Sequence, residues 1–166
     1  MTDCRPAKFP RRPPRLTMLV NREAYVFFVT IVTWNRQRVL ASPDLHAAFR
    51  AYAGDALVVG GTVTHYVLMP DHLHFFIGFG RHGIQLVRFI NGLKRTMGKV
   101  LSQHGHWLPH WQPGFFDRLL RREESYVQKT EYIWNNPVRQ NLVTRAADWP
   151  FLGIVNDVPV HHMMTS

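Results

Sequence analysis

The chain has 166 residues, a length typical of one compact domain, and its 46% apolar content excludes an intrinsically disordered chain. A formal net charge of +9 and a pI of about 10.4 indicate a polyanionic partner, with nucleic acid ahead of an anionic membrane surface. The single cysteine, Cys4, excludes an intramolecular disulfide and a cysteine-based zinc cluster. With no apparent membrane span or signal core, we expect a cytoplasmic, DNA-associated protein.

Residues 1–20 are predicted to form a basic, proline-rich arm, because proline fixes φ and lacks the backbone N–H that a helix needs. Three interpretations of this arm stay open: a solvated tail, a nonspecific contact to phosphate, and a specific DNA-binding arm. Its cations are Arg5, Lys8, Arg11, Arg12 and Arg15.

The next part of the chain is predicted to run strand, helix, strand, strand. Tyr25–Thr33 is dense in β-branched and aromatic residues, which indicates a central strand. Ser42 as N-cap and Pro43 at the first helical position predict a helix that continues to about Leu57. A glycine pair ends this unit. The two following strands are predicted at Thr62–Met69 and His72–Phe79.

A long amphipathic helix is predicted at Ile84–Gln103, where apolar residues recur at helical spacing. Its polar face carries charges of one sign only, so this face is either solvated or turned toward phosphate. The cations on it are Arg88, Lys94, Arg95 and Lys99.

Residues 104–114 are rich in His, Trp and Pro, and no regular element is predicted there. Trp107 and Trp111 either cap the core or stack on bases. The elements predicted beyond this segment are a short fourth strand at Phe115–Leu120 and a last helix from Arg121 to about Asn135, with Pro137 as its limit.

This order of elements is that of the split βαβ, ferredoxin-like plan with one added helix. We therefore predict an α+β fold with a four-stranded antiparallel sheet, helices on one face, and an added C-terminal helix. The predicted boundaries are the arm at 1–20, one domain at 21–151, and a C-terminal tail at 152–166.

The central apolar run contains two histidines separated by one leucine, His72 and His74. Alternate residues of a strand point to the same face, so the two imidazoles are expected side by side while Leu73 points into the core. Neutral imidazole is a good ligand for a divalent metal. The alternative is a pair of hydrogen-bonded histidines on a half-buried strand.

The last predicted helix carries a possible nucleophile, Tyr132. Asn136 lies four residues later on the same face, and Gln128 lies one turn earlier. Tyr126 is a competing candidate that faces roughly away from Asn136. A tyrosine hydroxyl becomes a useful nucleophile toward phosphate when a metal polarises that phosphate. The alternative for Tyr132 is a core residue of an amphipathic helix.

Four motifs over Tyr25–Phe151 occur in an order that resembles a known family. They are Thr33-Trp34-Asn35-Arg36, then Met69-Pro70-Asp71-His72-Leu73-His74, then Trp111-Gln112-Pro113-Gly114-Phe115-Phe116-Asp117, and finally Tyr132-Ile133-Trp134-Asn135-Asn136-Pro137-Val138 with Leu142-Val143 and Asp148-Trp149-Pro150-Phe151. Together they resemble the REP-associated tyrosine transposases, whose His-hydrophobic-His element is the HUH motif of single-tyrosine transposases.

This resemblance implies a ferredoxin-like HUH endonuclease that acts on single-stranded DNA with Mg²⁺ or Mn²⁺. It implies His72, His74 and Asn136 as metal ligands, with Gln128 as a substitute for the third, and Tyr132 as the nucleophile. The cations expected to position the DNA backbone are Arg36, Lys94, Arg95, Arg121 and Arg122.

The expected reaction is a transesterification in which Tyr132 attacks a DNA phosphorus, leaving a 5′-phosphotyrosine link and a free 3′-OH without any nucleotide cofactor. The resemblance adds palindromic repeats that fold into hairpins as the target. Two other functions stay open: a non-catalytic ferredoxin-like nucleic-acid binder, and a metal-dependent phosphodiesterase that uses water. A monomer is favoured over a dimer.

Overall fold

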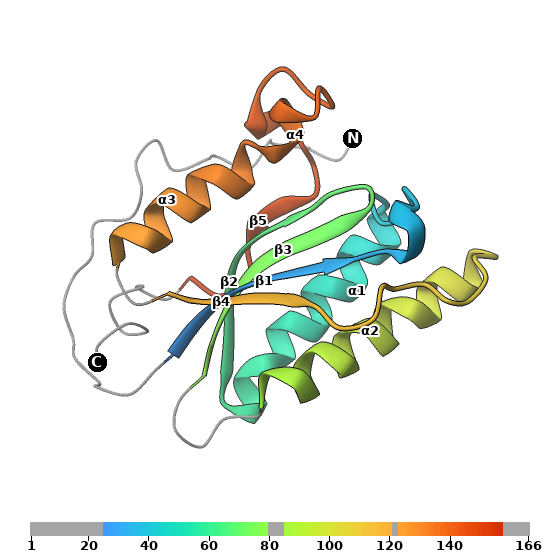
Figure 1. Cartoon of the computed structure of the whole chain (residues 1–166), viewed down its shortest axis with the longest axis horizontal. Coiled ribbons are helices and arrows are strands. Elements are labelled where there is room, and N and C mark those ends of the chain that lie inside the picture. Colours follow the sequence, from blue (N-terminus) through green and yellow to red (C-terminus); the bar gives the residue numbers. More distant parts are fainter. Residues whose placement is uncertain (1–24, 80–84, 121–122, 158–166) are drawn as a thin grey trace, which may run out of the picture.

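The computed structural model describes residues 25–79, 85–120 and 123–157 (Figure 1). The predicted arm at 1–20 and the cations Arg121 and Arg122 lie outside the described residues. The strands are β1 (Tyr25–Val32), β2 (Gly61–Leu68), β3 (His72–Phe79), β4 (Phe116–Leu120) and β5 (Leu152–Ile154). The helices are α1 (Pro43–Gly54), α2 (Leu86–Gln103), α3 (Glu123–Trp134) and α4 (Asn136–Arg139), with 3-10 turns at Trp34–Arg36, Asp55–Val59 and Ala146–Asp148.

The strands form one antiparallel five-stranded sheet in the order β4-β1-β3-β2-β5. This confirms the α+β class, whereas the prediction of four strands was wrong by one. Residues 152–154, which we had placed in a tail, pair with β2 as β5. The indole N–H of Trp149 donates to the carbonyl of Leu68 (3.0 Å), and the amide of Leu68 donates to the carbonyl of Phe151 (2.8 Å). These two bonds hold the chain beside the β2 edge.

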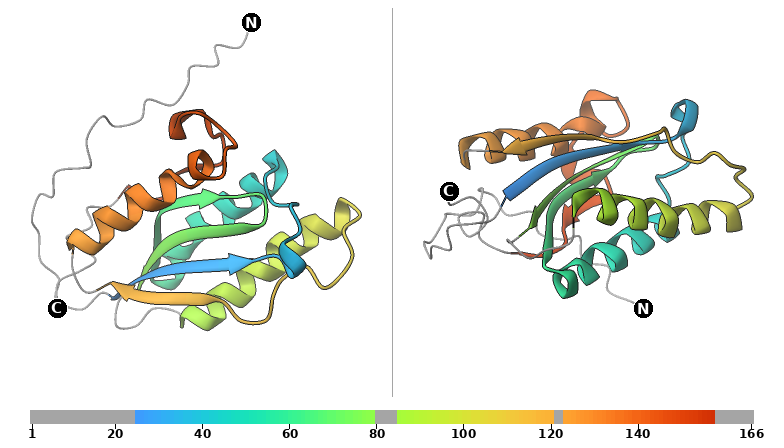
Figure 2. Two further views of the ribbon diagram at one scale, coloured as in Figure 1. Left: turned by 45° about the horizontal axis from the view of Figure 1, so that its top comes forward. Right: turned by 60° about the horizontal axis from the view of Figure 1, so that its bottom comes forward.

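The two faces of the sheet are covered by different helices, with α1 and α2 on one face and α3 on the other (Figure 2). Alternation along β3 separates the two layers: Leu73, Phe75 and Ile77 pack with α1 and α2, and Phe76 packs with Tyr126 and Ile133 of α3. The odd-numbered residues of β3 therefore belong to the main core, and the even-numbered residues face α3.

Helix α1 begins where the sequence predicts, because the Ser42 side chain accepts a hydrogen bond from the amide of Leu45 (3.3 Å) and Pro43 opens the helix. It ends earlier than predicted, at Gly54, and a 3-10 turn at Asp55–Val59 completes the connection to β2.

A bulge in β2 fixes how α3 lies on the sheet. The pairing of β2 with β3 shifts register between Val63 and Tyr66, so Thr64 and His65 both turn toward α3. The Tyr126 hydroxyl lies 2.7 Å from Thr64 Oγ1 and 2.6 Å from His65 Nδ1, and all three side chains are buried. Tyr126 is therefore the polar anchor of α3 on the sheet.

Candidate functional site

The histidine pair lies at the start of β3, on the face of the sheet that α3 covers. His72 and His74 are both largely buried, and their ring centroids lie 4.7 Å apart. Leu73 between them is fully buried in the opposite core, as strand alternation requires. Two imidazoles on a central strand are thus held side by side by the pairing of β3 with its neighbours on both sides.

Each imidazole is oriented through its Nδ1 atom. His72 Nδ1 lies 2.6 Å from a carboxylate oxygen of Asp71, and His74 Nδ1 lies 2.7 Å from Thr30 Oγ1 on β1. When both Nδ1–H groups donate these bonds, each Nε2 keeps its lone pair, which is the tautomer that a metal ligand needs. Within the described residues, neither Nε2 has a hydrogen-bond partner.

Burial keeps both rings neutral. Desolvation, with smaller contributions from the neighbouring His72 and Lys129, lowers the pKa of His74 to about 3. Desolvation also lowers the pKa of His72, outweighing the hydrogen bond that His72 donates to Asp71, which raises it. A neutral imidazole pair has no proton to displace when a cation approaches, so the donor set fits a divalent metal ion.

The structure distinguishes the two tyrosines of α3. Tyr126 is 2% exposed, and burial raises its pKa far above the ordinary value, so its hydroxyl is committed to the anchor with Thr64 and His65. Tyr132 is 42% exposed near the end of α3, which makes it accessible to a strand of DNA. Of these two candidates, only Tyr132 has the accessibility that a nucleophile needs.

Two cations flank the Tyr132 ring. Lys129 Nζ lies 5.3 Å from the ring centroid, and Arg139 Cζ lies 4.7 Å from it. The same Lys129 ammonium lies 5.5 Å from the ring centroid of Phe28, and Phe28 stacks on His74 with centroids 5.3 Å apart. Tyr132 and the histidine pair therefore share neighbours on one face of the sheet.

The two candidates for a third ligand differ in position. Asn136 is buried and begins α4, because α3 ends at Trp134 and Pro137 cannot continue its hydrogen-bond ladder. One turn residue, Asn135, thus separates the two helices, so Tyr132 and Asn136 do not share an unbroken helix. Gln128 is exposed on α3. No cluster of three His, Cys, Asp or Glu side chains suited to a metal occurs in 25–79, 85–120 or 123–157.

The three predicted DNA-positioning cations that the structure describes, Arg36, Lys94 and Arg95, are not all gathered at the histidine pair. Arg36 is near it, because its guanidinium lies 3.4 Å from Asp71. Lys94 and Arg95 lie on α2, which covers the opposite face of the sheet. The Lys94 ammonium donates to the carbonyls of Gln112 (2.9 Å) and Gly114, so it holds that loop, and a role for it in DNA binding stays a prediction.

Several residues around the site were missed by sequence reasoning. Asp71 was named only as part of the motif around the histidines and was given no role of its own, although its place before the first histidine was a usable signal. Thr30, Lys129 and Arg139 meet the site through strand register and helix packing, which no local pattern reports.

The two tryptophans that the sequence left ambiguous have different environments. Trp111 packs against the main core, and its indole N–H donates to the carbonyl of Lys94 (3.0 Å). Trp107 is 89% exposed. Trp111 therefore caps the core, whereas Trp107 is free to contact a partner.

Sequence comparison finds relatives with one shared name. Over 48 residues the chain is 38% identical to the REP-associated tyrosine transposase of Escherichia coli K12, a match that spans 29% of each chain. Over 143 residues it is 22% identical to a Haemophilus influenzae protein that carries the same name provisionally, covering 80% of this chain and 81% of the relative. No family model matches the sequence.

The chain is also similar in fold to a solved transposase. A solved REP-associated tyrosine transposase bound to a REP hairpin has the same fold, with a TM-score of 0.62 and 19% identity over 85% of this chain and 82% of that one. The resemblance to the REP-associated tyrosine transposases, first indicated by four sequence motifs, is thus confirmed by the curated relatives and by the fold. Within the described ranges, no helix is both long and apolar enough to cross a membrane.

Proposed function

We propose that this protein is a metal-dependent single-stranded DNA endonuclease and strand transferase that acts on palindromic repeat hairpins through a covalent 5′-phosphotyrosine intermediate. The observation that carries the proposal is the neutral histidine pair, with each Nδ1 engaged and each Nε2 available, on the sheet face that α3 covers. The relatives named as transposases support the reaction class, and the hairpin-bound neighbour supports the substrate.

The proposed metal ligands are His72 and His74 through Nε2, with the side-chain oxygen of Asn136 or Gln128 as the third. Mg²⁺ or Mn²⁺ would, when bound, polarise the scissile phosphate and stabilise charge on the leaving oxygen. Asp71 and Thr30 would keep the two imidazoles in the tautomer that this requires, as outer-shell carboxylates and hydroxyls commonly do.

The covalent step uses the Tyr132 hydroxyl. Its oxygen attacks phosphorus, and the bond from phosphorus to the 3′ oxygen breaks as the new ester forms. The phenolic proton leaves to solvent, and the departing 3′ oxygen takes up a proton to become a 3′-OH. The reverse reaction with a different 3′-OH joins two strands, and bond energy is conserved throughout because the phosphodiester is exchanged and never hydrolysed.

Lys129 and Arg139 would assist this step by charge. Their positions beside the Tyr132 ring favour the negative charge that develops on its oxygen and attract the phosphate that it attacks. The net charge of +9 over the chain adds a long-range attraction for DNA.

A denaturing gel tests the proposal. The protein is incubated with Mn²⁺ and end-labelled single-stranded DNA that carries a palindromic repeat and its flanking sequence. We expect a covalent protein–DNA band with the wild type and none with Tyr132→Phe. Tyr126→Phe is the matched control, because it removes the other tyrosine hydroxyl of the same helix, and its adduct is expected to persist at low temperature.

Each alternative function predicts a different result in these assays. Cleavage that survives in Tyr132→Phe without any adduct would identify water as the nucleophile, and the protein would be a phosphodiesterase. Binding without cleavage on every repeat tested would identify a non-catalytic nucleic-acid binder. His72→Ala is expected to abolish the adduct yet leave DNA binding and the circular-dichroism spectrum intact. If it only unfolds the protein, the pair is structural.

A further inference from the structure

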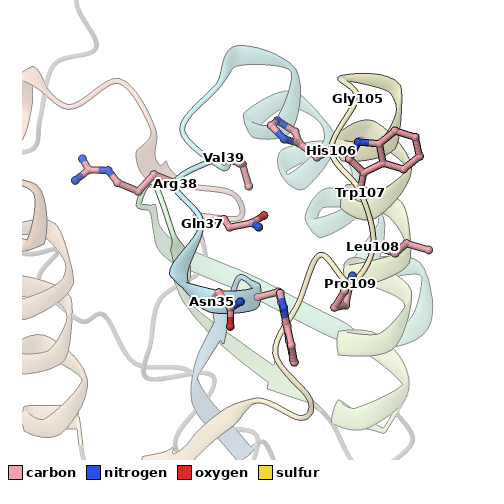
Figure 3. Close-up of a pocket in the computed structure, with 10 residues that line it drawn as sticks. Asn35, Gln37, Arg38, Val39, Gly105, His106, Trp107, Leu108 and Pro109 are labelled. Atoms are coloured by element: carbon pink, nitrogen blue, oxygen red, sulfur yellow. The ribbon is translucent and has the colours of Figure 1, made fainter.

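A pocket lies beside the site, between the segment that follows β1 and the segment that follows α2. Its volume is about 510 Å³, which is within the range of small-molecule sites. Residues 34, 35 and 37–39 form one wall and residues 105–109 form the other. Figure 3 shows Gln37 extending from the first wall into the space between them and His106 extending from the second, while Arg38 points away.

The rim of this pocket carries two large apolar side chains in water. Trp107 is 89% exposed and Leu108 is 79% exposed. Exposure of neighbouring large apolar residues is unfavourable for a protein without a partner, because burying such side chains removes apolar surface from water. An indole also offers a flat face on which any nucleobase can stack.

The exposed rim is not a consequence of a loose loop. The His110 ring lies 3.0 Å from the carbonyl of His106, and the amide of Trp34 donates to the carbonyl of His110 (2.8 Å). The amide of Gln112 donates to the carbonyl of Val32 (3.0 Å), which ties the far end of the segment to β1. Both walls are therefore held to each other and to the sheet, with Trp107 left outward at the tip.

Polar groups suited to a base edge line the same pocket. The side-chain amides of Asn35 and Gln37 make no hydrogen bond to any described residue, so they are available to a ligand. An amide carries both a donor and an acceptor, the combination that pairs with the edge of a nucleobase. The backbone of Asn35 has φ 50°, in the left-handed region that asparagine adopts more readily than most residues.

The segment that forms the first wall of the pocket is connected to the histidine pair through Asp71. The Thr33 hydroxyl donates to the carbonyl of Asp71 (2.9 Å), and the Arg36 guanidinium lies 3.4 Å from the Asp71 carboxylate. Asp71 in turn bonds to His72. These bonds tie the loop that forms the first wall to the residue that precedes the histidine pair.

We propose that this pocket takes one unstacked base of the single-stranded DNA beside the scissile phosphate, with Trp107 stacking on it or on its neighbour at the rim and the Gln37 amide contacting its edge. This inference rests on the proposed function for its ligand. It adds a site for base recognition, which the cationic contacts to the backbone cannot supply by themselves.

Equilibrium binding of labelled single-stranded DNA tests the proposal in the presence of a chelator, so that no cleavage occurs. Anisotropy is measured for the full-length wild type, Trp107→Ala, Trp107→Phe and Val58→Ala. Val58 is the matched control because it is 86% exposed and follows the C-terminal end of α1. The pocket lies near the other end of α1, since the His104–Asp44 ion pair (3.0 Å) joins the first turn of α1 to the end of α2 that leads into the pocket. The two positions are separated by roughly 18 Å of helix, at 1.5 Å per residue over the 12 residues of α1.

We expect Trp107→Ala to weaken binding by about 5- to 100-fold, the usual loss for one base–aromatic stack. Trp107→Phe should retain most of the affinity, and Val58→Ala should match the wild type. Abasic substitution along the strand gives a sharper readout: one position should weaken binding by the wild type and have little further effect on Trp107→Ala, because the two changes remove the same contact.

Two results would overturn the inference: unchanged affinity in Trp107→Ala, or an equal loss in Val58→Ala. Failure of the proposed function is a separate result, since it would show as a missing adduct on the denaturing gel even where the Trp107-dependent binding is present.

Discussion

Removal of the Tyr126 hydroxyl is the sharpest test of how α3 is held on the sheet. In Tyr126→Phe the ring keeps its packing against Phe76, whose centroid lies 4.5 Å away, so the change deletes only the oxygen. That oxygen is the shared hydrogen-bond partner of Thr64 Oγ1 and His65 Nδ1. Thr64 is 1% exposed and His65 is 5% exposed, so water cannot replace the lost partner without opening the interface.

The expected cost follows from that burial. A buried polar group without a partner costs about 1–3 kcal/mol, and this substitution leaves two such groups without a partner. We therefore expect the free energy of unfolding to fall by about 2–5 kcal/mol, a large share of the roughly 5–15 kcal/mol typical of a domain. Tyr52→Phe is the matched control, because its hydroxyl makes one bond, to the carbonyl of Phe89 (3.1 Å), at a half-buried position.

Urea unfolding followed by circular dichroism measures both variants. Tyr126→Phe should lower the midpoint with little change in slope, since the surface exposed on unfolding stays the same. Tyr52→Phe should lose about 1 kcal/mol. A loss in Tyr126→Phe no greater than that in Tyr52→Phe would refute the anchor, and with it the argument that the β2 bulge positions the helix that carries Tyr132.

Three further outcomes are expected from other parts of the structure. Gly92→Ala should destabilise the α1–α2 packing by about 1–3 kcal/mol in urea unfolding, because its Cβ would lie 2.0 Å from the Tyr52 hydroxyl, and adding Tyr52→Phe should recover part of the loss. Burial lowers the pKa of His65 to about 4, below its unfolded value near 6.5, so its contribution to stability should be complete above about pH 6.5 and fall by about 3 kcal/mol as pH drops to 4. His65→Gln should remove that part of the slope and leave the part that the buried His74 contributes, whereas an unchanged slope would exclude His65 as a source. Asp71→Asn should weaken Mn²⁺ binding by about 10- to 100-fold in calorimetry, because the carboxylate that orients His72 is lost, whereas equal affinity would show that Asp71 does not support the ion.

Local patterns in the sequence were sufficient to place the main elements and the histidine pair. Dense apolar runs predicted β1 and β3, and Ser42-Pro43 predicted the first turn of α1. Strand alternation alone placed His72 and His74 on one face. These features depend on residues close in the chain, which is why they could be predicted without any knowledge of the tertiary structure.

Features that depend on distant pairings could not be predicted in this way. The three-residue strand β5 exists because Trp149 and Phe151 dock on Leu68, far away in sequence. The bulge at Thr64 and His65 contains no glycine to mark it, and only the pairing of β2 with β3 shows it. The sequence pattern likewise predicted a basic face on α2, but it could not show which side of the sheet this helix would cover.

The placement of α2 and α3 on opposite faces changes which charges can act together with Tyr132. The helix-face cations predicted to position DNA are on α2, across the full thickness of the sheet from the histidines. Lys129, Arg139 and Arg36 were not grouped by any sequence pattern, yet they all lie on or beside the site face. Charge attraction falls with distance and is screened within about 10 Å at moderate salt. Phosphate contacts during strand cleavage should therefore depend on this second set, and the α2 cations should contribute mainly to long-range attraction.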